Sequence, residues 1–169
     1  ISFNVTPVND APAGTDAVLT AIEDTPYAFT AANFGFSDAV DGNAFAGVVI
    51  ATLPANGTMR LNGAAVSAGT FVTAAQIAAG QLTWQGAANA NGSGLGSFTF
   101  QVRDNGGTAN GGQDTDQSPN SISFTVASVN DAPAGADTML SATEDTPYVF
   151  TGGNFGFSDP ADGNGFAGV

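Results

Sequence analysis

The chain has 169 residues, with 15 carboxylates, two arginines and no lysine, and its formal net charge is −13. Proteins that bind nucleic acid or an anionic membrane surface neutralise phosphate with lysine and arginine, so this charge balance argues against both partners. No apolar run is long enough to cross a bilayer, and we expect no membrane insertion. The absence of cysteine and histidine also removes disulfides, thiolate nucleophiles and the usual zinc sites.

An internal repeat joins the two ends of the chain. Residues 122–169 match residues 1–48 at 34 of 48 positions, at a constant offset of 121 residues. A unit of 121 residues has the size of a single domain. We therefore expect residues 1–8 to be the last strand of a preceding repeat and residues 9–129 to be one complete repeat. Residues 130–169 are then the first part of the next repeat, within a longer polypeptide.

Short alternating segments follow one another along the unit, and each is typical of a half-buried strand. In chain order they cover residues 27–29, 59–61, 97–103 and 122–126, while residues 45–53 form a longer apolar run typical of a central strand and residues 82–84 another short strand. In residues 97–103, Phe98, Phe100 and Val102 are expected to face the core. Clusters of Gly, Asn, Asp and Pro separate the segments and favour turns. The pattern predicts an all-β antiparallel sandwich with Greek-key connections.

Two kinds of segment fall outside the alternation. In residues 73–80, Thr73 can cap a single helical turn and Gly80 can end it. Residues 9–12 and 130–133 both read Asn-Asp-Ala-Pro and lie between units. Because proline pushes the residue before it towards extended geometry, we interpret these two segments as stiff linkers.

The carboxylates gather in short clusters beside turns, with no lysine or arginine among them. The clusters are Glu23 with Asp24, Asp38 with Asp41 and Asn43, Asp104 with Asn105, and Asn130 with Asp131. Crowded carboxylates repel one another, so a cation from solution is expected among them. Calcium is the natural candidate because it binds carboxylate, amide and carbonyl oxygens.

Asp114 and Asp116 lie apart from these clusters, in a long loop before the last strand. Two interpretations are open for them. They form a separate loop site with amide and carbonyl oxygens, or they are simply solvated acids, and the second interpretation is favoured.

The sequence resembles the cadherin-like repeats of giant bacterial surface and secreted proteins. The resemblance rests on VNDAP at residues 8–12 and 129–133, EDTP at residues 23–26 and 144–147, LPANGTMRLNG at residues 53–63 and SFTFQVRDNGG at residues 97–107. Residues 57–84 are similar to the cadherin-like repeat of chondroitin sulfate proteoglycans. The resemblance covers the whole unit and implies a cadherin-like or Ig-like sandwich in tandem repeats, located outside the cell or at the surface of a bacterium.

The resemblance also implies calcium bound between successive repeats. At the junction that follows the complete unit, the implied ligands are Glu23, Asn130, Asp131, Asp159, Asp162 and Asn164. At the preceding junction they are Asn9, Asp10, Asp38, Asp41, Asn43 and Asp104, and Glu144 is the counterpart of Glu23 in the next repeat. The linker lacks the leading Asp and the second Asn of the cadherin pattern, and two residues separate the acids of the Asp38 loop. These departures imply fewer ions, held more weakly than in cadherins.

The leading hypothesis for function is a calcium-stiffened spacer in a giant extracellular adhesin or matrix protein, acting in cell adhesion or biofilm. Its partners would be adjacent repeats of the same polypeptide and an unknown adhesion target. A filament of copies joined by strand addition at residues 1–5 is the alternative. A third hypothesis is a glycan-binding module in which Trp84 stacks on a sugar, although a lone Trp in a sandwich is more often a core residue. Catalysis is not expected, because the acids lie in polar loops without His, Cys or Lys.

Overall fold

The computed structural model describes residues 1–169 and divides into two compact units, Ile1–Ala127 and Ser128–Val169. Each unit is described by itself below. The domain bounds expected from the repeat, 1–8, 9–129 and 130–169, remain a prediction. No helix of the chain combines the length and the apolar character needed to span a membrane.

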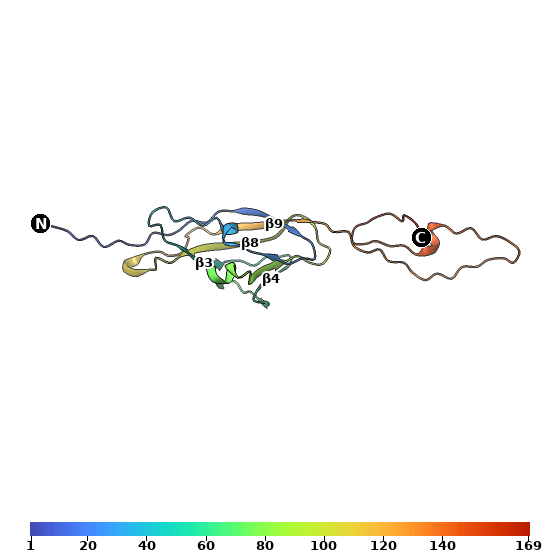
Figure 1. Cartoon of the computed structure of the whole chain (residues 1–169), viewed down its shortest axis with the longest axis horizontal. Helices are drawn as coiled ribbons and strands as arrows, with labels where there is room; N and C mark the ends of the chain where they lie inside the picture. Colours follow the sequence, from blue (N-terminus) through green and yellow to red (C-terminus); the bar gives the residue numbers. More distant parts are fainter. The chain divides into compact units, whose positions relative to one another are not determined.

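Unit Ile1–Ala127 is built from two sheets (Figure 1). The five-stranded sheet has the order β1 (Ala17–Ile22), β9 (Asn120–Ala127), β8 (Gly92–Asp104), β3 (Phe45–Ile50) and β6 (Phe71–Thr73). The four-stranded sheet has the order β2 (Tyr27–Ala28), β7 (Leu82–Gln85), β4 (Thr58–Leu61) and β5 (Ala64–Ala65). Paired strands are antiparallel except β1 and β9, which run parallel. The all-β, Ig-like sandwich expected from the sequence is confirmed.

The core lies between the two sheets and is rich in aromatic rings. Trp84 of β7 stacks on Phe124 of β9, with ring centroids 4.0 Å apart and an interplanar angle of 6°. Phe98, Phe100 and Val102 of β8 are almost fully buried, as the alternation predicted. Trp84 is 1% exposed and its indole N–H donates to the carbonyl of Asn56, so it is a core residue and cannot stack on a sugar.

The predicted helical turn is confirmed as α1 (Ala74–Ala78). Thr73 Oγ1 accepts a hydrogen bond from the Gln76 amide, and Gln76 Oε1 accepts one from the Thr73 amide. This reciprocal pair satisfies donors that a helix N-terminus otherwise leaves open. Gly80 follows the helix at φ +68°, the left-handed conformation that ends many helices. Two 3-10 turns, η1 (Ala31–Phe34) and η2 (Ala109–Gly111), complete the unit.

Three strands were not predicted, namely β1, β5 and β6. Strand β1 is at the edge of its sheet, and it exposes two of its three large apolar residues: Val18 is 71% and Ile22 is 52% exposed, while Leu19 packs against the core. A segment with large apolar residues on the outer face gives no usable alternation. The apolar run from residue 45 to 53 forms a strand only as far as Ile50, and beyond it the amides of Ala51 and Thr52 both donate to the carbonyl of Thr99 in β8.

Unit Ser128–Val169 has one 3-10 turn, η3 (Gly152–Phe155), and one isolated bridge between Ala134 and Ser158. Residues 1–8 carry no secondary structure, although the equivalent residues 122–127 lie in β9. A strand at residues 1–8 needs a paired neighbour, as β9 has in β1 and β8.

Candidate metal centre at the start of the repeat

The linker at residues 9–13 enters unit Ile1–Ala127 beside the acidic loop of residues 38–43. The Asp10 amide donates to Asp41 Oδ2 over 2.6 Å. Ala13 and Ser37 exchange two backbone hydrogen bonds of 2.8 Å each. These contacts hold the linker and the loop side by side, as the resemblance implied for the preceding junction.

The acidic loop is folded around the carboxylate of Asp38. Asp38 Oδ1 accepts from the Asp41 amide at 3.0 Å, and Oδ2 accepts from the Asn43 amide at 2.9 Å. Burial works to raise the pKa of Asp38, but the backbone amides of residues 40–43 outweigh it and hold that pKa below its ordinary value of 3.8. The Asp38 carboxylate is therefore ionised at neutral pH and turned into its own loop.

Asp104 joins this cluster from the end of β8, where it is 2% exposed. Its carboxylate accepts from Asn9 Nδ2 at 3.1 Å and from the Gly106 amide at 2.8 Å. Asn43 Nδ2 in turn donates to Asn9 Oδ1. A hollow of about 290 Å³ opens at this end of the unit, lined by Pro7, Val8, Asn9, Asp41, Asn43 and Gly106. The structure thus brings together all six residues expected at the preceding junction.

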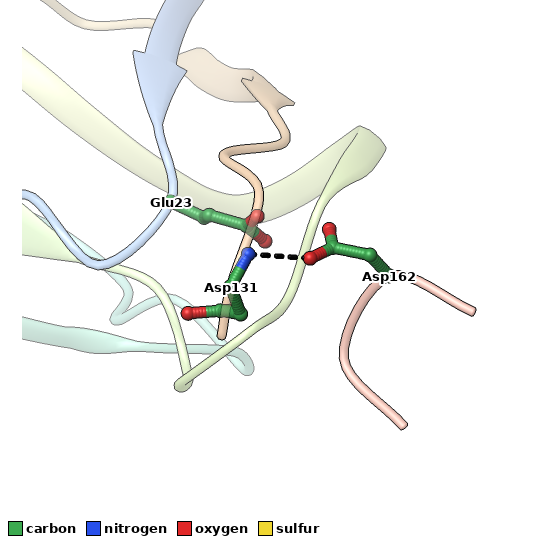
Figure 2. Close-up of side chains that lie close together, drawn as sticks. All are labelled: Glu23, Asp131 and Asp162. Carbon is green, nitrogen blue, oxygen red and sulfur yellow. Dashed lines mark hydrogen bonds between the residues drawn. The ribbon is translucent and has the colours of Figure 1, made fainter. Parts of the chain in front are cut away.

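The same arrangement recurs in unit Ser128–Val169. The Asp131 amide donates to Asp162 Oδ2 over 2.5 Å (Figure 2). The Asp162 amide donates to Asp159 Oδ1 at 3.2 Å, and Asn164 Nδ2 donates to Asn130 Oδ1 at 2.8 Å. Five of the expected residues, Asn130, Asp131, Asp159, Asp162 and Asn164, are therefore connected within this unit by the bonds that their equivalents make in the first.

Glu23 lies at the opposite end of the five-stranded sheet from Asp104. Its amide donates to the carbonyl of Ala127, the last residue of β9, and its Oε2 accepts from Asn91 Nδ2 at 3.0 Å. Since β8 runs antiparallel to β9, the start of β8 at Gly92 lies beside Glu23 while its last residue, Asp104, lies at the other end. Asn91, which sequence reasoning did not identify, thus holds the Glu23 carboxylate. Glu144 is exposed, and only its backbone carbonyl makes a hydrogen bond, with Thr146.

Asp114 and Asp116 are not solvated acids, which corrects the favoured interpretation of their loop. They are 8% and 6% exposed. Asp114 pairs with Arg103 over 2.5 Å and also accepts from Thr115 Oγ1. Asp116 accepts from the amides of Gly14 and Ser118. Both carboxylates fasten the loop to β8 and to the segment after the linker, so their role is structural.

Hydrogen bonding also explains the pKa of Asp114. Burial favours the neutral acid, but the guanidinium of Arg103 and the hydroxyl of Thr115 favour the carboxylate, and the net effect holds the pKa of Asp114 below 3.8. Sequence reasoning missed this pair because Arg103 and Asp114 are 11 residues apart and meet only through the bridge between Arg103 and Thr115.

The donor set at the start of the repeat fits a hard cation. It offers carboxylate and amide oxygens, and no sulfur or imidazole nitrogen. Arg103 is paired with Asp114, and Arg60 donates to the carbonyl of Gly63, so both basic side chains are engaged elsewhere. The residues present are therefore suited to calcium.

One comparison with known proteins identifies a family. The family model of the bacterial Ig domain matches residues 9–116. No curated protein and no solved structure matches the chain.

Proposed function

The chain belongs to the bacterial Ig domain family, and from this premise we propose that it is a spacer repeat of an extracellular bacterial adhesin, stiffened by calcium at the junctions between repeats. Bacterial Ig domains are structural modules rather than enzymes, and they typically act outside the cell or at its surface. The proposal adds to that family role the cadherin-like character, the calcium and the adhesive context.

The observation that carries the proposal is the recurrence of one acidic arrangement in two units. In each, an Asp of the linker donates its amide to the second Asp of the acidic loop. In each, an Asn of the loop donates its amide to the Asn of the linker. Several carboxylates at one end of a unit raise its local negative charge, and a cation bound among them would offset their repulsion.

Calcium would be held by oxygens from both sides of a junction. At the junction before the complete repeat, the following repeat would contribute the carboxylates of Asp10, Asp38, Asp41 and Asp104. At the junction after it, the following repeat would contribute those of Asp131, Asp159 and Asp162. From the preceding repeat the carboxylate is Glu23, which β1 carries to the end of β9 from which the linker departs. A bound ion would supply the positive charge that the chain lacks, and ligands from consecutive repeats would fix the angle between them.

Calorimetry tests this proposal. Extracellular calcium sites have Kd values of about 10⁻⁴ to 10⁻³ M, so about 10 mM calcium should stabilise the folded chain by about 1.4–2.7 kcal/mol per site. For a domain of this size, that corresponds to a rise in Tm of about 5–12 °C relative to chelator. Magnesium should give a smaller rise, because it dehydrates reluctantly and demands stricter octahedral geometry.

Two variants locate the effect. Asp131→Ala should lose much of the calcium-dependent rise, because it removes the linker carboxylate of the junction to which Glu23 belongs. Asp137→Ala is the matched control: it makes the same change in net charge at an exposed acid outside the clusters, and it should keep the rise. A Tm that is the same in calcium and in chelator would reject the calcium part of the proposal and leave the structural role of the family.

A further inference from the structure

The side chain of Asn9 is fully engaged in hydrogen bonds within unit Ile1–Ala127. Its Nδ2 donates to Asp104 Oδ1 at 3.1 Å and to the carbonyl of Gln113 at 2.7 Å. Its Oδ1 accepts from Asn43 Nδ2. Its backbone carbonyl accepts from the Gln113 amide at 2.8 Å. Both amide hydrogens and the amide oxygen of this linker residue are therefore bonded to protein groups.

Two glycines make room for Asn9. A Cβ placed on Gly106 would lie 2.0 Å from Asn9 Oδ1 and 2.4 Å from Asn43 Nδ2. A Cβ placed on Gly112 would lie 3.1 Å from Asn9 Cβ. The loop after β8 therefore has room for the Asn9 side chain only because glycine stands at these two positions.

The rest of the linker is attached to the same unit. The Asp10 amide is bound by Asp41, Pro12 is buried, and Ala13 is paired with Ser37. The Gly14 amide donates to Asp116 Oδ2 at 2.9 Å. Residues 9, 10, 13 and 14 are thus hydrogen-bonded to this unit, and Pro12 is buried against it.

We propose that Asn9 is a positioning residue that latches the linker onto the repeat that follows it, and that this latch closes without calcium. The linker is then a fixed part of the following repeat. Bending at a junction is confined to the amino-terminal side of this Asn, and calcium acts there. The latch goes beyond the proposed function, since it requires no ion. The bonds from Asn164 to Asn130 and from Asp131 to Asp162 repeat part of it in the next unit.

Amide hydrogen exchange of the whole chain in chelator tests the latch directly. We expect slow exchange at the amides of Asp10, Ala13 and Gln113, all of which are donors to this unit. Fast exchange of these amides in chelator, with protection appearing only in calcium, would overturn the proposal and make the cation the cause of the ordering.

Two variants separate a latch from a ligand. Asn9→Asp keeps the shape but removes the two donated hydrogens and faces Asp104 with a second carboxylate. We expect exchange at Asp10 and Gln113 in chelator to become at least tenfold faster. If Asn9 instead served calcium as an oxygen ligand, Asn9→Asp would leave exchange at Asp10 and Gln113 in chelator unchanged and would bind calcium more tightly. That result would overturn the assignment.

Gly106→Ala provides an independent test that changes no charge. Its new methyl group would occupy the place of the Asn9 amide, so it should release the same amides. Asp10→Asn is the reciprocal variant, because Asp10 joins the latch through its backbone amide alone. It should leave exchange in chelator unchanged while it weakens calcium binding in a titration. If calcium does not bind the unmodified chain in this titration, the calcium part of the proposed function is rejected. The exchange rates measured in chelator still test the latch, because they do not depend on calcium.

Discussion

Replacement of Phe124 tests the core on which the whole repeat depends. Phe124 is fully buried, stacks on Trp84, and has edge contacts with Tyr27 and Phe29 at centroid distances of 5.3 and 5.9 Å. Loss of its transfer free energy together with the cavity left behind should cost about 3–5 kcal/mol in Phe124→Ala. Against a typical domain stability of about 5–15 kcal/mol, this is a large fraction of the total.

The repeat supplies a matched control for this experiment. Phe3 occupies the equivalent position, 121 residues earlier, and is 88% exposed. Phe3→Ala makes the same chemical change and should alter the free energy of unfolding by less than about 0.5 kcal/mol. In urea, with a slope of about 2 kcal/mol/M, the midpoint should fall by about 1.5–2.5 M for Phe124→Ala and stay in place for Phe3→Ala. Equal costs for the two variants would refute the reasoning.

Three further predictions concern the loops and turns. Asp114 has a pKa lowered on folding, so its contribution is present above its unfolded pKa of 3.8 and is lost as the pH falls through the folded value. Acid unfolding monitored by Trp fluorescence should therefore depend less on pH in Asp114→Asn, and an unchanged profile would contradict this. Gly47→Ala should lower the free energy of unfolding by at least about 2 kcal/mol, because the new Cβ would lie 2.2 Å from the Val72 carbonyl oxygen and the residue has φ +152°. Gly86→Ala is the control: its nearest contact would be at 3.5 Å, and in thermal melts it should cost less than half as much. Thr73→Ala removes the cap of α1 and should cost about 1 kcal/mol in chemical denaturation, so a neutral effect would show that the capping box is dispensable.

The sequence predicted the parts of the fold in which side chains alternate strongly. In these strands, bulky core residues alternate with polar ones, as at Phe98, Phe100, Phe124 and Trp84. Such alternation identifies which face of the strand is buried. Strand β1 could not be found in this way, because Val18 and Ile22 face outward at the sheet edge. Its parallel pairing with β9 joins residues about 105 positions apart, and no local pattern encodes that contact.

The candidate site was predictable to a different degree. The repeated clusters of acids beside turns predicted that Asp10, Asp38 and Asp41 lie together, and the structure places them at one end of the unit, while their role as metal ligands stays a prediction. The hydrogen bonds of Asn9 could not be predicted, because its partners Asp104 and Gln113 are 95 and 104 positions away in the sequence. The solvated interpretation of Asp114 was wrong for a similar reason: its partner Arg103 lies 11 residues earlier, on β8, and the two side chains meet only in the folded structure.

The central claim of the proposed function, that calcium fixes the angle between consecutive repeats, can be measured as a distance distribution. The chain has no cysteine, so Val18→Cys and Met139→Cys, at positions 71% and 98% exposed, accept one spin label in each unit. Pulsed electron paramagnetic resonance should give a broad distribution in chelator and a narrow one in calcium, and Asp131→Ala should restore the broad one. A distribution of the same width in calcium and in chelator would contradict the claim.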